Sequence, residues 1–191
     1  MEKTTALAFP SSSLRGVREV AIVVGASLFI AACAHITLPL PFSPVPLTLQ
    51  NFAVLLVGLM LGWRRGLAAL VLYLAEGAAG MPMFNPTGPG GLAQLFGPTG
   101  GFLLAYPLVA ALAGFIFAAG RKTLASALFA GTAAELLLFA SGTLWLALLS
   151  HSFSQAARFA LFWGFLPAEL IKVMAAAAIA SGCWRARKAV P

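Results

Sequence analysis

The sequence predicts an all-α polytopic membrane protein with six transmembrane helices and both termini in the cytoplasm. Three observations support this fold class: an apolar composition, six apolar segments, and basic residues that gather on one side. Of the 191 residues, 61% are hydrophobic and only 9% are charged, whereas soluble domains are about half apolar and about a quarter charged. So few charged side chains cannot cover a water-soluble surface, which excludes that class.

The six apolar segments are separated by polar, proline-rich or basic connections. They cover approximately residues 17–38, 47–63, 66–80, 100–119, 123–149 and 167–184. A helix needs about 20 residues to cross the hydrocarbon, so the second and third segments are short for a span. The long Ala and Leu runs lack the alternation of a transmembrane β-barrel, and helices are therefore the expected spanning structure.

The connections on one side carry residues that interrupt helices or favour an interface. Four prolines between residues 39 and 46 break the chain after the first segment, because proline lacks the N–H that a helix requires. Residues 81–99 form an uncharged loop rich in Gly and Pro. Residues 150–166 contain Arg158 and several aromatic rings, and they predict an amphipathic segment at the outer membrane interface.

The opposite side holds most of the basic residues. Ten of the twelve Lys and Arg residues flank the segments at the two termini and in the second and fourth connections. With six spans these positions share one side, which the positive-inside rule identifies as cytoplasmic. We therefore expect a cytoplasmic tail (residues 1–16), a six-helix membrane domain (17–184) and a basic cytoplasmic tail (185–191), in a multi-pass protein of the cell membrane.

Apart from Arg18, Glu19 and His35 in the first segment, four ionisable residues lie within the apolar segments, namely Glu76, Glu135, Glu169 and Lys172. A charge at the bilayer centre costs about 2.5–3.5 kcal/mol on insertion scales, so such residues usually face the bundle interior. Glu169 and Lys172 are three residues apart and share one helical face. Pro167 favours a helix start, which places this pair near the external end of the sixth segment. A ligand clamp and a structural ion pair both fit the pair, and Glu76 and Glu135 have no assigned role.

Uncharged polar groups from the predicted external loops lie at the same end. Thr48 and Gln50 open the second segment, and Phe84 and Asn85 begin the long loop. Gly100 lies in a glycine-rich stretch whose backbone can approach a ligand closely. The candidate binding residues are Thr48, Gln50, Phe84, Asn85, Gly100, Glu169 and Lys172.

Several classes of function find no support in the sequence. It contains no Walker A loop for ATP and no Cys/His cluster with metal-ligand spacing. We expect no catalytic residue, metal or cofactor. The basic clusters flank apolar segments instead of alternating with aromatic residues, which argues against nucleic-acid binding. An intramembrane enzyme using Glu135 or Ser141 and a purely structural membrane subunit are the alternatives outside transport.

Four motifs, in chain order, resemble those of a known family. They are P-V-P-L-T-L-Q at 44–50, a segment from Gly66 to Phe84, G-P-T-G-G-F at 97–102 and L-P-A-E-L-I-K at 166–172. Together they resemble the biotin-specific substrate-binding (S) subunit of energy-coupling factor (ECF) transporters, the BioY family. The resemblance implies an S-component-like bundle that captures biotin from outside. It also implies a complex with a membrane scaffold subunit and two ATPase subunits.

The resemblance further implies roles for individual residues. Members bind biotin through an Asn in the third loop and an acid and a Lys in the sixth helix, which match Asn85, Glu169 and Lys172 here. The family pattern has Asp where this chain has Glu169, whose longer side chain reaches further. A carboxylate complements the two N–H groups of the ureido ring of biotin, Asn and Lys complement its carbonyl, and Phe84 suits the thiophane ring. The carboxylate of biotin either pairs with Lys172 or faces the loops. An S subunit for another small vitamin is the nearest alternative.

Overall fold

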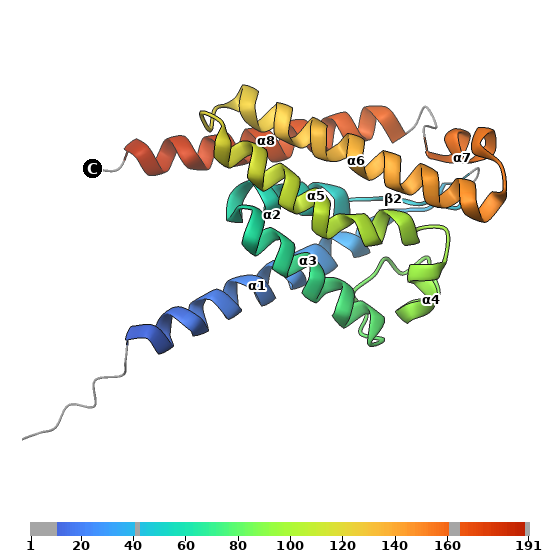
Figure 1. Cartoon of the computed structure of the whole chain (residues 1–191), viewed down its shortest axis with the longest axis horizontal. Helices are drawn as coiled ribbons and strands as arrows, with labels where there is room; N and C mark the ends of the chain where they lie inside the picture. The colour runs from blue at the N-terminus through green and yellow to red at the C-terminus, as the bar shows by residue number, and fades with distance from the viewer. Residues whose placement is uncertain (1–10, 41–42, 161–164, 190–191) are drawn as a thin grey trace, which may run out of the picture.

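The computed structural model describes residues 11–40, 43–160 and 165–189. Within these ranges the chain forms helices and one short antiparallel ribbon (Figure 1). The elements are α1 (Ser11–His35), β1 (Thr37–Leu38), β2 (Leu47–Thr48), α2 (Gln50–Leu61), α3 (Trp63–Ala78), α4 (Gly91–Phe96), α5 (Gly100–Ala119), α6 (Leu124–Ser150), α7 (Phe153–Ala160) and α8 (Phe165–Ala189).

The described helices confirm a helical membrane protein. Four of them, α1, α5, α6 and α8, are long and apolar enough to cross a membrane. The apolar helix α2 has 12 residues and α3 has 16 residues, so both are as short as the sequence suggested. A single residue, Gly62, separates them, and its φ of +80° is a conformation that glycine adopts without strain.

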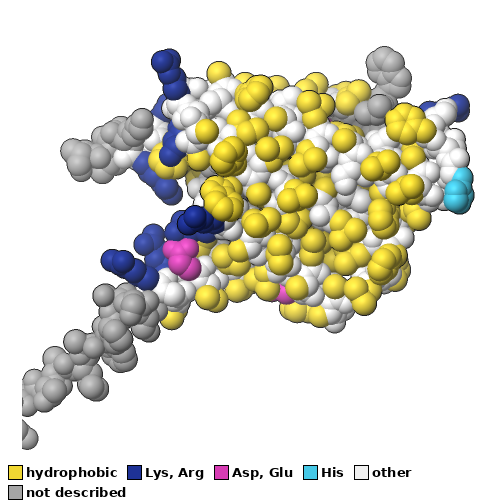
Figure 2. Space-filling model, in the orientation of Figure 1, with side chains coloured by type: hydrophobic (Ala, Val, Ile, Leu, Met, Phe, Trp, Pro, Cys, Tyr) yellow, Lys and Arg dark blue, Asp and Glu magenta, His cyan; other side chains and the backbone are white. Residues whose placement is uncertain are grey.

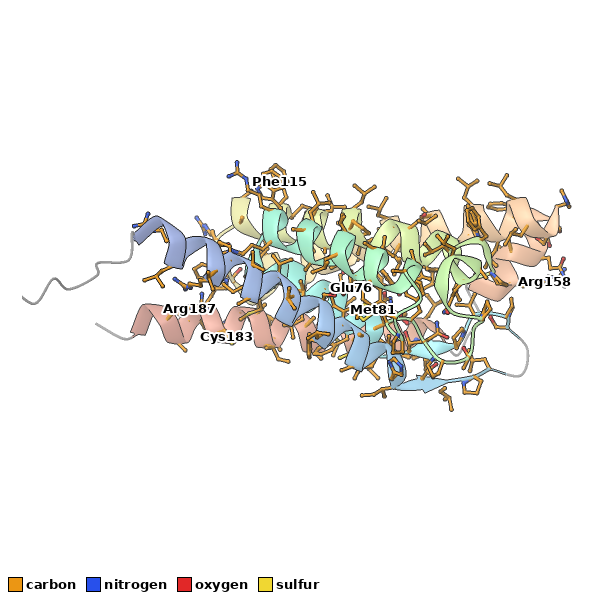
Figure 3. All side chains as sticks on the ribbon, turned by 90° about the horizontal axis from the view of Figure 1, so that it is seen from below. Glu76, Met81, Phe115, Arg158, Cys183 and Arg187 are labelled. Atoms are coloured by element: carbon orange, nitrogen blue, oxygen red, sulfur yellow. The ribbon has the colours of Figure 1, made fainter. Side chains whose placement is uncertain are left out.

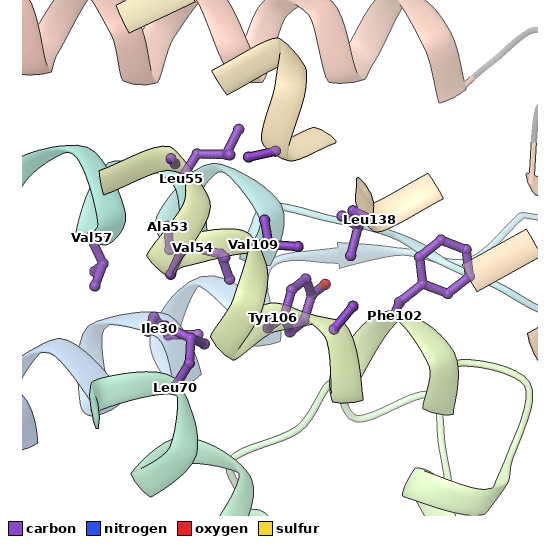
Figure 4. Close-up of a cluster of buried hydrophobic side chains, with 14 of the residues drawn as sticks. Ile30, Ala53, Val54, Leu55, Val57, Leu70, Phe102, Tyr106, Val109 and Leu138 are labelled. Atoms are coloured by element: carbon purple, nitrogen blue, oxygen red, sulfur yellow. The ribbon is translucent and has the colours of Figure 1, made fainter. Parts of the chain in front are cut away.

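The helices pack so that α5 and α2 lie at the centre. Helix α5 contacts α2, α3 and α6, whereas α2 contacts α1, α3 and α8. Aliphatic side chains from α1, α2, α3 and α5 fill the interior, including Ile30, Val54, Leu70 and Val109 (Figure 4). Both ends of the described chain lie at one end of the bundle, whereas α4, α7 and the ribbon lie toward the other (Figure 1).

Two glycines allow the backbones of α2 and α5 to touch. A Cβ atom at Gly58 would collide with the carbonyl oxygen of Ala110, and one at Gly114 would lie 2.6 Å from the carbonyl oxygen of Gly58. Small residues at such crossings permit the close packing that holds helices together in lipid. The contact fixes α2 against the centre of the bundle.

The proline-rich connection forms a β-ribbon, which the sequence did not predict. Thr37 pairs with Thr48 and Leu38 with Leu47. Residues that precede proline favour extended backbone, and Leu38 precedes Pro39. Because β2 leads directly into α2, the ribbon holds Thr48 over the helix end where Gln50 lies.

The helices at the two ends of the chain continue into the predicted tails. Helix α1 begins at Ser11 and α8 runs to Ala189, while residues 1–10 and 190–191 lie outside the described ranges. The predicted interfacial segment contains α7, and residues 161–164 of that segment are likewise not described. Both cysteines are free: Cys33 is buried and Cys183 is partly buried.

The surface separates apolar from basic regions. Apolar side chains cover the middle of the visible face, and Lys and Arg side chains gather at the end that carries the termini (Figure 2). Arg158 lies at the opposite end from Cys183 and Arg187 (Figure 3). Exposed apolar side chains such as Leu108, Phe115 and Leu136 fit a band that faces lipid.

Candidate ligand-binding site

A cavity lies between the ribbon and helices α2, α5, α6 and α8. Its polar lining comes from Thr48, Gln50, Asn51, Asn85, Thr99 and Glu169, and its aromatic lining from Phe102, Tyr106 and Phe139. The free volume is about 40 Å³, which is room for only a few water molecules. Pockets for small organic ligands usually enclose about 300–1,000 Å³, so the wall must move to admit a ligand of that kind.

Beneath this cavity, four polar side chains form a network that joins α2, α6 and α8. The Nδ2 atom of Asn51 donates to Glu135 Oε1 at 2.7 Å and to Glu169 Oε2 at 2.8 Å. Lys172 Nζ donates to Glu169 Oε1 at 2.6 Å. Asn51, Glu135, Glu169 and Lys172 are each at most 8% exposed. One amide therefore holds two carboxylates from different helices side by side.

Two oxygen atoms of this network have no hydrogen-bond partner among the described residues. They are Asn51 Oδ1 and Glu135 Oε2, and both are buried. Buried polar atoms are normally paired, and an unpaired one costs free energy. An amide oxygen and a carboxylate oxygen both accept hydrogen bonds. The network is therefore suited to a ligand that carries N–H or O–H donors.

A second set of hydrogen bonds fixes the long loop to α2 and α3. Gln50 Nε2 donates to the hydroxyl of Tyr73 at 2.8 Å, and that hydroxyl donates to the Met83 carbonyl at 3.0 Å. Asn85 Oδ1 accepts from Thr87 Oγ1 at 2.6 Å. In the described part of the chain nothing accepts from the amide nitrogen of Asn85, so this group remains a donor at the cavity wall.

Four of the seven candidate binding residues line the main cavity, namely Thr48, Gln50, Asn85 and Glu169. Lys172 lies on the wall of a neighbouring cavity under the ribbon, which has a free volume of about 240 Å³ and shares Thr48 with the first. The ion pair between Glu169 and Lys172 connects the two cavities. The sequence spacing therefore identified a pair that is buried where the cavities meet.

The other two candidates, Phe84 and Gly100, pack behind the cavity wall. Phe84 lies edge-on to Tyr73 with ring centroids 5.5 Å apart, and its ring fills the space beside Gly77. Gly100 is the first residue of α5, and a Cβ there would collide with the carbonyl of Leu95. Both residues shape the wall from behind.

Sequence reasoning missed Asn51, Glu135, Phe102 and Tyr106 as members of the site. Asn51 follows Gln50 directly, so two adjacent polar residues at the start of an apolar segment could have indicated that Asn51 belongs to the site. Glu135 stood out as an intramembrane carboxylate, but Asn51 is 84 positions away from it. The aromatic residues resemble any other apolar residue of their segment.

The remaining polar residues of the spans make structural contacts. Glu76 accepts a hydrogen bond from Ser27 of α1. Ser141 donates to the carbonyl of Gly101 at 2.9 Å, so its partner is not a base. The described residues include no group of three or more His, Cys, Asp or Glu that could hold a metal ion.

A helical membrane bundle with a buried polar network under a small cavity defines a membrane-embedded ligand-binding protein. The family model described as BioY matches residues 2–189, and the chain belongs to the BioY family. It is similar to the biotin transporter BioY2 of Lactococcus lactis subsp. cremoris (36% identity; 81% of each chain). It is also similar to the biotin transporter BioY of Thermotoga maritima (36% identity; 86% of this chain and 90% of the relative).

A solved structure has the same fold. It is the S-component for biotin from an ECF-type ABC transporter, which matches with a TM-score of 0.79 over 95% of each chain at 24% identity. The predicted S-component-like helical fold is thereby confirmed. Together with the apolar helices, the relatives identify a multi-pass protein of the cell membrane.

Proposed function

We propose that this chain captures biotin as the substrate-binding subunit of an ECF-type transporter. Its relatives are named biotin transporters, and they align with most of the chain. The observation that carries the proposal is the position of Glu169, which lies on the cavity wall between the amide of Asn51 and the ammonium of Lys172. The chain functions in transport and not as an enzyme.

The chemistry of the site matches the ureido ring of biotin. Glu169 accepts the ring N–H groups, and the unpaired oxygens of Asn51 and Glu135 offer further acceptors. Asn85 and Lys172 supply donors for the ureido carbonyl. An analogue without this ring would leave buried groups unpaired, which is how such sites discriminate between ligands.

The apolar part of biotin is proposed to lie against the wall of α5 and α6. Phe102, Tyr106 and Phe139 line this side of the cavity. Thr48 and Gln50 flank it from the ribbon and α2, while Phe84 and Gly100 support the wall from behind. The small free volume implies that the ribbon or these rings move when biotin enters.

The six-span topology with cytoplasmic termini also belongs to the proposal. The position of both ends of the described chain at the basic end of the bundle supports an even number of crossings. Helices α2 and α3 would then be the two short crossings. The membrane domain (17–184) lies between two cytoplasmic tails, and the cavity opens to the outside.

The proposed partners are those of an ECF transporter. Membership of an S-component family implies work with an energy-coupling module. We propose that this module consists of a membrane scaffold subunit and two ATPase subunits. The absence of a Walker A loop from this chain supports a division in which ATP is hydrolysed elsewhere.

Ligand identification on the purified full-length chain tests the function. We expect native mass spectrometry to find biotin after expression in biotin-fed cells, and excess biotin but not thiamine or riboflavin to displace radiolabelled biotin. Lys172→Ala should weaken binding at least tenfold, because it leaves Glu169 buried without its ammonium partner. Arg158→Ala, at the far side of α7, is the control. Displacement by thiamine or riboflavin alone would assign a different vitamin.

A further inference from the structure

A basic pocket lies at the opposite end of the bundle from the ligand cavity. It is formed by the turn between α5 and α6 and by the last turns of α8, with a free volume of about 160 Å³. Its lining residues are Arg121, Lys122, Thr123, Trp184 and Arg185. Three of these five are cations and none is an acid, so the electrostatic field in the pocket favours an anion.

The backbone of the turn is arranged to bring the cations together. Lys122 has φ +55°, a left-handed conformation that few residues other than glycine adopt. Its Nζ lies 3.6 Å from the centroid of the Trp184 ring, and the guanidinium carbon of Arg187 lies 5.7 Å from the same ring. Cation–π attraction favours both positions. Two cations therefore lie over one indole, and Arg121 and Arg185 line the same pocket.

These positive charges have no carboxylate partner among the described residues. Elsewhere at this end of the bundle, Arg65 makes two hydrogen bonds of 2.6 Å to Glu19. The only other ion pair in the described ranges joins Lys172 and Glu169 in the ligand site. Like charges held this close repel each other, so binding of an anion would stabilise the pocket.

The place of the pocket indicates the kind of anion. It lies at the ends of the candidate spans in α5, α6 and α8, and its lining includes Trp184, a residue type that is enriched at membrane interfaces. Leu124, in the first turn of α6, is 39% exposed beside the pocket and can contact an acyl chain. Basic pockets between helix ends are known binding places for anionic lipid head groups.

We propose that this pocket binds the phosphate of an anionic phospholipid. Arg121 and Arg185 donate charge-assisted hydrogen bonds to the phosphate oxygens, for which the planar guanidinium is well suited. Lys122, held against Trp184, adds a third positive charge. The pocket is separate from the ligand cavity, and the proposal does not depend on which vitamin the chain binds.

Lipid binding by the purified full-length chain tests the proposal. Native mass spectrometry after exchange into mixed phosphatidylglycerol and phosphatidylcholine should show selective retention of phosphatidylglycerol. Arg121→Gln and Arg185→Gln should each weaken that retention about fivefold, the share of one basic residue at a charged membrane surface. The matched controls Arg15→Gln, at the same end, and Arg158→Gln, at the other, should retain it.

Three outcomes would overturn the proposal. The first is equal retention of the two lipids, and the second is an equal loss in the control variants. The third is a thermal stabilisation by inorganic phosphate alone that requires Arg121, since this would identify a site for a soluble anion. Biotin binding is measured on the same samples. Unchanged biotin affinity in Arg121→Gln, with lipid retention weakened, separates this site from the proposed function.

Discussion

At the level of residues, the side-chain amide of Asn51 connects the helices that form the ligand site. Each hydrogen on Nδ2 of Asn51 goes to a different carboxylate, one on α6 and one on α8. Hydrogen bonds to charged groups contribute about 1.5–3 kcal/mol each. Asn51 therefore sets the positions of Glu135 and Glu169, which otherwise belong to separate helices.

Replacing Asn51 tests this role. Asn51→Leu keeps a similar volume but removes both hydrogen bonds, so Glu169 loses the group that orients it. We expect biotin binding to weaken about tenfold or more, measured by equilibrium binding of radiolabelled biotin. Asn51→Gln, which retains an amide, should recover part of the affinity. Equal affinity in the leucine variant and the parent chain would show that Asn51 does not position the site.

The two carboxylates should differ in importance. Glu169 lines the cavity and Glu135 does not, although both accept from Asn51. Glu169→Gln should therefore reduce biotin affinity at least tenfold, because an amide replaces the carboxylate at the ligand. Glu135→Gln should change it less than about threefold. Isothermal titration calorimetry measures the biotin affinity of both variants. A larger loss in Glu135→Gln than in Glu169→Gln would mean that Glu135, not Glu169, contacts biotin.

The sequence could predict part of this site because part of it is local. Glu169 and Lys172 share a helical face by their spacing, and both are charges in an apolar segment. Asn51 and Glu135 meet only because α2 and α6 pack together in the fold. Phe84 looked like a ligand contact, but its ring fills the space that Gly77 leaves beside Tyr73. The local sequence does not show whether an aromatic ring contacts the ligand or packs behind the cavity wall.

At the level of elements, the close crossing of α2 and α5 depends on glycine residues, which have no side chain. Gly58→Ala would drive a Cβ into the carbonyl of Ala110, a backbone atom that cannot move aside alone. Overpacking of this kind costs about 1–3 kcal/mol, and we expect a lower thermal unfolding midpoint in detergent. Gly25→Ala, in α1 with no atom near the new methyl group, is the control and should be neutral or slightly stabilising. Equal midpoints for both variants would contradict close packing at this crossing.

Some elements can be predicted from sequence patterns and others cannot. The long helices α1, α5, α6 and α8 follow from apolar length alone. The β-ribbon does not, because each strand has two residues and alternation needs more. Its pairing depends on the positions of the helices at either side, α1 and α2, which the local sequence does not specify. The sequence therefore identified Thr48 as a polar residue after the prolines, but it did not predict that Thr48 lies in a strand.

At the level of the whole molecule, the polar groups divide between two ends. Helix α7 and the ribbon, which borders the ligand cavity, lie toward one end, whereas both ends of the described chain and most Lys and Arg side chains of the visible face lie at the other (Figures 1 and 2). Helices that join these ends must cross the apolar band between them. In the proposed six-span topology, α2 and α3 make two of these crossings, one on each side of Gly62, and both pack against neighbouring helices. The basic end of the bundle, interpreted by the positive-inside rule, thus supports the orientation that we propose.

Site-directed labelling tests that orientation on the intact protein. Arg158→Cys places a thiol on exposed α7, and Arg185→Cys places one at the basic end; both positions are exposed. In a Cys33→Ala, Cys183→Ala background, a membrane-impermeant maleimide should label the Arg158→Cys variant in whole cells. It should reach the Arg185→Cys variant only after permeabilisation, because the positive-inside rule places the basic end in the cytoplasm. Labelling of both thiols in intact cells would mean an even number of crossings between them and would contradict a span by α8, and the opposite pattern would invert the protein. Retained biotin uptake by each variant shows that the labelled molecules are folded.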